Sequence, residues 1–217
     1  MTFSSFKSFG TLKNQRILKQ GFQYTCDTYD SSGLFNNVTN KYDGIFNNSA
    51  IISTVSPAVG TACLTMNANY FVTLPFYTNS PSGFSVCFWV KTNSNARYSR
   101  ILEFGHLRIF IFNLSNLSFQ AGGSGNVYAA YPNFTDNVWR HFTFVMNPDK
   151  SVIIYANGIY YTTINIEAFP FINNIGYIGK SFGSDPLFIG SIDDMRLYDN
   201  KLLSAEEVQQ IYTNPYP

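Results

Sequence analysis

The chain has 217 residues, of which 45% are hydrophobic and 18% aromatic, enough for the core of one sizeable domain. Only 12% of the residues are charged, and the formal net charge is +1. The aromatic content excludes a disordered chain, and the lack of a uniform positive field argues against a general nucleic-acid binder. Aromatic residues in this abundance favour strands over helices.

The first 22 residues differ from the rest of the chain. They contain four basic residues and no acidic residue, and Phe3, Phe6 and Phe9 recur at intervals of three. We predict a basic N-terminal arm over residues 1–22 and a domain over residues 23–217. The arm contacts a protein neighbour through Phe3, Phe6, Phe9 and Arg16, or packs on its own domain.

Targeting and redox signals are sparse. The first 25 residues hold no apolar run of signal-peptide length, and no run approaches the roughly 20 apolar residues of a membrane-spanning helix. We therefore expect synthesis in the cytosol, no membrane insertion, and incorporation into a virion as one destination.

Cys26, Cys63 and Cys87 lack CxxC spacing, which predicts buried free thiols.

From residue 23 onward, short apolar runs alternate with turn signals. The predicted strands cover residues 70–74, 84–90, 107–112, 114–119, 139–146, 151–155 and 159–166. Asn157-Gly158, between the last two, is a strong hairpin signal. Strands at this spacing, with no helical periodicity between them, predict an all-β antiparallel sandwich or barrel.

One helix is predicted, close to the C-terminus. Ser204 followed by Glu207 forms a capping box, in which each side chain bonds the other residue's backbone N–H. Val208, Ile211 and Tyr212 then follow at helical spacing and form one apolar stripe. Pro215 ends the helix.

Four segments carry a family resemblance. FSVCFWVK (84–91) is similar to the strand FTISFWVK, NVWRHFTFV (137–145) to NTWYHVAVV, SVIIYANG (151–158) to VKLYVNG, and IGSIDDMRLY with LLSAEEV (189–198 and 202–208) to FNGSIDDVRIYNRALSAEEI. On these segments the chain resembles the laminin-G-like, concanavalin-A-like jelly-roll superfamily, in its version related to pentraxins. The resemblance implies a two-sheet antiparallel jelly-roll sandwich with one short C-terminal helix.

The resemblance also implies one structural Ca²⁺, because many relatives hold this ion where an early Asp meets a late Asp pair. The matching ligands are Asp27 or Asp30, a carbonyl near Gly44, and Asp194. Strand alternation predicts that Asp193 and Asp194 point to opposite faces, and we favour Asp194 as the ligand. The alternative is that these carboxylates bond backbone amides or Arg196.

A glycan site needs exposed aromatic rings beside planar polar groups. Tyr98 lies between Arg97 and Arg100, and Tyr128 and Tyr131 flank two alanines. These five residues are the predicted ligand-binding set, with ordinary packing of the rings as the alternative.

Catalytic patterns are weak. The chain has four Glu residues, and none belongs to an E-x-D-x-x-E strand; a pairing of Glu103 with Asp136 is conceivable but has no support in the sequence. His141 matches a strand position of the family, and His106 sits at a strand end. We predict no enzyme activity and no catalytic residues.

These observations lead to three functional hypotheses. The first is a non-catalytic recognition or assembly module that binds a glycan or a protein partner through a jelly-roll surface. The second is a structural subunit of a larger particle, such as a virion surface or minor capsid component, docked through its N-terminal arm. A glycoside hydrolase is the third and least favoured. The predicted partners are protein neighbours or a glycan, without nucleic acid.

Overall fold

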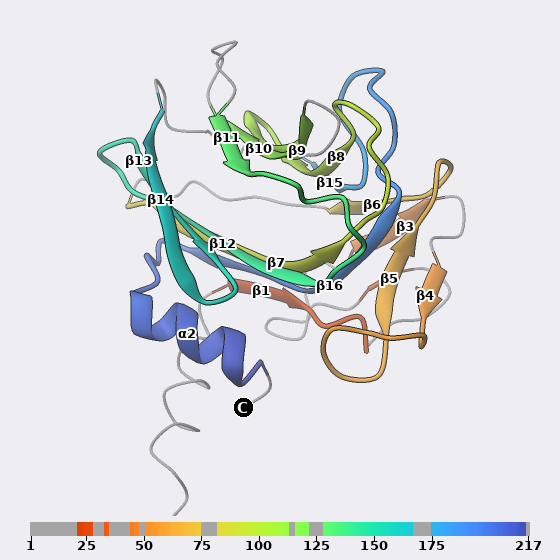
Figure 1. The fold of residues 1–217 in the computed structure, drawn as a ribbon, viewed down its shortest axis with the longest axis horizontal. Helices are drawn as coiled ribbons and strands as arrows, with labels where there is room; N and C mark the ends of the chain where they lie inside the picture. The colour runs from red at the N-terminus through yellow and green to blue at the C-terminus, as the bar shows by residue number, and fades with distance from the viewer. Residues whose placement is uncertain are drawn as a thin grey trace, which may run out of the picture.

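The computed structural model describes residues 21–27, 33–34, 44–47, 51–74, 82–112, 116–121, 128–166 and 175–215. Within them, two antiparallel sheets stack face to face, and one helix lies against the outside of one sheet (Figure 1). This confirms the predicted all-β jelly-roll sandwich. The predicted arm residues Phe3, Phe6, Phe9 and Arg16 lie outside the described residues.

The sheet that carries the helix is called sheet A. In spatial order it contains β14 (Ile159–Asn165), β13 (Ser151–Ala156), β12 (Arg140–Met146), β7 (Phe84–Lys91), β16 (Gly190–Asp199), β5 (Cys63–Met66) and β4 (Ile51–Ser53), with β1 (Gly21–Tyr24) also paired to β16. β1 begins two residues before the predicted start of the domain. The last part of the predicted arm is therefore a strand of sheet A.

The second sheet is called sheet B. It contains β11 (Tyr128–Tyr131), β10 (Asn116–Gln120), β9 (Leu107–Phe112), β8 (Arg100–Phe104), β15 (Gly176–Ile178), β6 (Phe71–Leu74), β3 (Gly44–Asn47) and β2 (Gly33–Leu34). The predicted strand at 107–112 has the observed bounds, and the one at 114–119 is observed at 116–120.

The core lies between the two sheets and is rich in phenylalanine. Phe144 of sheet A stacks on Phe119 of sheet B, with ring centroids 5.4 Å apart, and on Phe88 at 6.2 Å. All three side chains are buried, because alternate residues of each strand point to the same face. The inner faces of the two sheets thus form one continuous apolar layer.

A second apolar cluster lies on the outer face of sheet A, beneath α2 (Ala205–Thr213). Val208 and Ile211 of the helix pack against Cys87, Val145 and Tyr198 of the strands. The predicted capping box is present: Ser204 Oγ accepts from Glu207 N at 3.2 Å, and Glu207 Oε2 accepts from Ser204 N at 2.9 Å. The helix therefore covers this face of sheet A, as Figure 1 shows.

The three cysteines are buried free thiols, as the sequence predicts. Burial raises the pKa of Cys87 to about 12. This thiol lies between the sheet and the helix and behaves as a small apolar side chain.

Candidate functional site

The outer face of sheet B carries a row of polar and aromatic side chains. Five strands contribute one residue each, and the strand register places each residue beside the next: Gln120, Arg108, Glu103, Tyr177 and Thr73. Their chain neighbours Leu102, Phe104 and Ile109 enter the core instead. Because side chains alternate between faces, the row lies on the side of sheet B away from the core.

Glu103 is the centre of this row. Its side chain is only 3% exposed, and its carboxylate accepts from Arg108 Nε at 2.8 Å and from Arg100 Nε at 3.3 Å. Arg108 Nη1 also donates to Gln120 Oε1 at 2.9 Å, and Arg100 Nη2 lies 3.0 Å from Asp185 Oδ2. These interactions hold the two guanidinium groups in fixed positions on the outer face.

Arg97, Tyr98 and Arg100 meet at one end of this face, so three of the five predicted ligand-binding residues come together. The Arg97 guanidinium lies 4.6 Å from the ring centroid of Tyr98 and 5.2 Å from that of Phe112, and Arg97 Nη2 donates to Tyr98 Oη at 2.8 Å. Arg100 covers the ring of Phe110 at 4.4 Å.

Tyr98 is held in position by its backbone. It has a φ of 67° in the turn before β8, and its N–H donates to the carbonyl of Ile111 at 2.8 Å. The Arg97 side chain is exposed and the Tyr98 ring is half-buried. An exposed guanidinium on a partly exposed ring is an arrangement that can contact a sugar by stacking and hydrogen bonding.

The other end of the face carries a second aromatic group. Lys180 Nζ lies 4.4 Å from the ring centroid of Tyr177 and 5.1 Å from that of Phe71, and Phe182 packs edge-on against Tyr177 at 5.0 Å. Phe182 is 47% exposed. Sequence reasoning missed this group, because its members lie on β6, on β15 and in the loop after β15.

The two remaining predicted ligand residues do not join these groups. The Tyr128 side chain lies outside the described residues. Tyr131 is paired in register with Leu117, which is part of the core, and its ring packs on Phe142 with centroids 5.3 Å apart. Tyr131 therefore faces the interior side of sheet B, opposite to Phe110 and Phe112.

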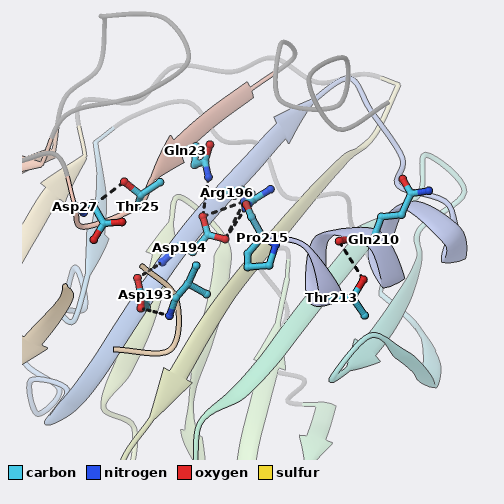
Figure 2. Close-up of polar contacts among 10 residues, drawn as sticks. Gln23, Thr25, Asp27, Asp193, Asp194, Arg196, Gln210, Thr213 and Pro215 are labelled. Atoms are coloured by element: carbon cyan, nitrogen blue, oxygen red, sulfur yellow. Dashed lines mark hydrogen bonds and ion pairs between the residues drawn. The ribbon is translucent and has the colours of Figure 1, made fainter. Parts of the chain in front are cut away.

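Of the predicted metal ligands, Asp194 lies beside Asp193 at a bulge in β16, shown in Figure 2. Ile192 and Met195 both enter the core, the register shifts between Asp193 and Arg196, and Asp194 has a φ of 41°. The two residues between Ile192 and Met195 thus interrupt the alternation of the strand. The prediction that Asp193 and Asp194 point to opposite faces of a regular strand is wrong for this reason.

Both carboxylates are engaged by protein donors. Asp194 accepts from Arg196 Nη2 at 2.6 Å and Nε at 3.0 Å, and from Gln23 Nε2 at 2.8 Å; Arg196 also donates to the carbonyl of Pro215. Asp193 Oδ2 accepts from the amides of Ala58 and Val59 at 2.9 and 3.0 Å. Burial raises the pKa of Asp193 to about 7, while these amides act in the opposite direction.

Asp27 lies in a separate set of bonds. Its Oδ1 accepts from Thr61 N, Thr61 Oγ1 and Ala62 N, each at 2.9 Å, so it organises the turn before β5. Among the described residues, no group of three or more His, Cys, Asp or Glu side chains could hold a metal.

At the bulge, the Asp194 carboxylate is paired with the Arg196 guanidinium, which is the alternative that the sequence analysis left open. Asp30 lies outside the described residues, and Gly44 is the first residue of β3. The single structural Ca²⁺ therefore stays a prediction, to be tested by a calcium-dependent shift in melting temperature.

The two histidines occupy different environments. His141 is fully buried under α2, where its ring lies 5.3 Å from Trp89 and 5.9 Å from Tyr212. Burial, and to a lesser degree the Arg196 charge, lowers the pKa of His141 to about 3. His106 is exposed in the turn between β8 and β9. Neither position joins the polar row of sheet B.

A family model described as the concanavalin A-like lectin/glucanases superfamily matches residues 66–209. A search of curated proteins found no match. None of the helices in the described part of the chain is long and apolar enough to cross a membrane.

Several solved structures share the fold. The binding domain of Paraclostridial Mosquitocidal Protein 1 aligns with a TM-score of 0.70 at 14% identity, over 90% of this chain and 52% of that one. The botulinum neurotoxin serotype D binding domain gives 0.69 at 16%, over 91% and 52%. Domain 4 of an extracellular arabinanase from Geobacillus stearothermophilus, solved with arabinotriose, gives 0.68 at 20%, over 89% and 99%. The chain thus spans about half of these toxin binding domains and nearly all of the arabinanase domain.

Proposed function

Since the chain belongs to the concanavalin A-like lectin/glucanases superfamily, we propose that it is a non-catalytic carbohydrate-binding module whose sugar site is the outer face of sheet B beside Tyr98. The observation that carries the proposal is the group of Arg97, Tyr98 and Phe112. Rings and planar donors are presented there on a rigid sheet.

The arabinanase domain supports this reading better than the toxins do. It is matched over 99% of its length and was solved with arabinotriose, so its likeness concerns a complete domain seen with an oligosaccharide. Cell entry of botulinum neurotoxin type C depends on interaction with two ganglioside molecules, but this chain covers only 53% of that structure. The toxins therefore support glycan binding less directly.

The geometry around Glu103 argues against hydrolysis. A glycosidase needs one carboxylic acid that can protonate the leaving group. The two oxygens of Glu103 accept from Arg108 and Arg100, so neither is free for that role. Asp136, the other member of the conceivable pair, is bound to Arg140 instead, with both contacts at 2.5 Å. Glycoside turnover that disappears on Glu103→Gln would overturn this part of the proposal.

A glycan array followed by titration calorimetry on the full chain tests the proposal. We expect binding to at least one oligosaccharide, and at least a tenfold loss of affinity for Tyr98→Ala, which corresponds to about 1.4 kcal/mol. Tyr160→Ala is the matched control, because Tyr160 is 58% exposed on β14 of sheet A. An array without any bound glycan, or a Tyr98 variant that binds like the wild type, would contradict the assignment.

A role as a subunit of a larger assembly is the second candidate, and one observation favours it. β14 is the last strand in the order of sheet A, and Ile159, Tyr160 and Tyr161 on it are 69%, 58% and 41% exposed. A strand edge with exposed apolar side chains and no charge is a typical pairing surface.

Docking through the N-terminal arm is tested separately. Deleting residues 2–20 should leave the domain folded and impair assembly; unchanged assembly would reject docking through the arm.

A further inference from the structure

The outer face of sheet B differs in charge from the rest of the described structure. The described residues include nine basic and ten acidic side chains. Four of the basic ones, Arg97, Arg100, Arg108 and Lys180, lie on or over this face with only two of the acidic ones, Glu103 and Asp185. Five basic and eight acidic residues are left elsewhere. This face therefore carries two more basic than acidic residues, and the proposed sugar site lies on it.

The two carboxylates on this face are already used. Arg108 and Arg100 both contact Glu103, and Arg100 also contacts Asp185. Arg97 and Lys180 are the two other cations of this face. Within the described residues, neither has a carboxylate within 4.0 Å; Arg97 contacts two rings and the Tyr98 hydroxyl, and Lys180 contacts two rings.

These two cations lie over strands on either side of β8. Arg97 lies over Phe112 of β9, and Lys180 lies over Tyr177 of β15, with β8 between the two strands. Strands two positions apart in a sheet are separated by about 10 Å. Tyr177 is level with Arg108 of β9, and Phe112 lies four residues further along that strand, so the two rings are further apart than this strand separation. This spacing suits a short oligosaccharide that stacks on the rings and places a negative group near one or both cations.

We propose that the site prefers glycans that carry a carboxylate, such as those with uronic or sialic acid residues. The inference rests on the proposed function of the same face and adds the chemical class of its ligand. A guanidinium next to aromatic rings can bond a carboxylate in a bidentate manner, while an ammonium acts as a point charge. A neutral sugar would supply no anionic partner to either cation.

The test compares matched acidic and neutral sugars on the full chain: 3′-sialyllactose against lactose, and trigalacturonic acid against its methyl ester. We expect at least one acidic sugar to bind tenfold or more tightly than its neutral counterpart at low salt, with the difference shrinking as NaCl is raised. The double variant Arg97→Gln with Lys180→Gln should lose the preference. Lys150→Gln, an exposed change in the turn between β12 and β13, should retain it.

Each contrary result would reject a different part of the proposal. Equal affinity for acidic and neutral sugars would reject the acidic preference and leave the carbohydrate-binding proposal standing. A preference that survives in the double variant would also reject the assignment to Arg97 and Lys180. A single-stranded oligonucleotide that binds as tightly as the acidic sugar would show a general polyanion surface and overturn the inference. Failure to bind any sugar, acidic or neutral, would remove the proposed function itself.

Discussion

The two outer faces of the sandwich are built from the same kind of strand, but α2 covers one of them and the other carries partly exposed aromatic rings. On sheet A, α2 covers Cys87, Val145 and Tyr198, and the buried His141 ring has no hydrogen-bond partner within the described structure for either nitrogen. On sheet B, the buried Glu103 is bonded to two arginines, and aromatic rings remain partly exposed on either side of it.

This difference gives the fold one outer face that stabilises it and another that is available for the proposed recognition. A helix of nine residues turns the outer face of sheet A into a second apolar core, where polar groups are costly unless paired. On the outer face of sheet B, Arg100 and Arg108 are ion-paired, while Arg97 and several rings remain exposed or partly exposed to solvent. Substitutions under α2 should therefore change stability, and substitutions at the exposed positions of sheet B should change binding.

The largest expected effect is that of Asp194→Ala. It leaves the guanidinium of Arg196, whose side chain is 3% exposed, without its carboxylate, and should lower the free energy of unfolding by about 3–5 kcal/mol. Asp136→Ala, which breaks an exposed pair with Arg140, is the control and should cost about 0–1 kcal/mol. Urea denaturation measures both. A loss below about 1 kcal/mol for Asp194→Ala would contradict the structural role of this pair.

The next effect concerns pH. The pKa of His141 is lowered to about 3, from an ordinary value near 6.5, so the folded protein keeps this ring neutral while the unfolded chain binds a proton. Its contribution to stability is complete above about pH 6.5 and is lost as the pH falls toward 3. Between pH 7 and pH 4 the wild type should lose about 3 kcal/mol more than His141→Phe.

Denaturation curves at both pH values check this prediction. His106→Gln, at the exposed histidine, is the control and should follow the wild type. If His141→Phe shows the same pH dependence as the wild type, the buried imidazole is not the group responsible.

A smaller effect is expected at the start of α2. Ser204→Ala removes the hydroxyl that accepts from Glu207 N and should cost about 1 kcal/mol, because an orphan amide of the first turn loses its partner. Ser204→Thr keeps the acceptor and should cost less. Thermal melts compare the two variants, and equal losses would argue against the cap as the cause.

The smallest effect on stability is expected on sheet B. Arg97→Ala removes an exposed side chain that contacts two rings and one hydroxyl, so the unfolding free energy should change by less than about 0.5 kcal/mol. Glycan affinity should fall in the same variant. A large loss of stability, or no loss of affinity, would break the separation between the two faces.

Sequence reasoning recovered the strands that show a clear local pattern. β7 and β12 alternate along long apolar runs, and β13 and β14 meet at Asn157-Gly158, where both turn residues have positive φ. β8 was missed because all five of its residues are buried and a bulge after Arg100 removes the alternation. β15 was missed because it has only three residues.

The candidate site was predicted only where it is local in sequence. Arg97, Tyr98 and Arg100 are near neighbours in the chain, so one window of sequence contained them all. Arg108, Gln120 and Tyr177 meet Glu103 only through the pairing of four strands, which no short segment encodes. The alternation of Arg108, Phe110 and Phe112 along β9 was the one signal that could have indicated a decorated outer face.

β16 also decides when sheet A can form during synthesis of the chain. It is a central strand of sheet A and pairs with β7 on one side, and with β5 and then β1 on the other. Until residues 190–199 have left the ribosome, those three strands lack a common partner, and sheet A cannot close. Pairings between such distant segments place folding in the range of milliseconds to seconds, and they expose unpaired strand edges on the nascent chain. Chains that stop before β16 should therefore aggregate rather than fold into a smaller sandwich.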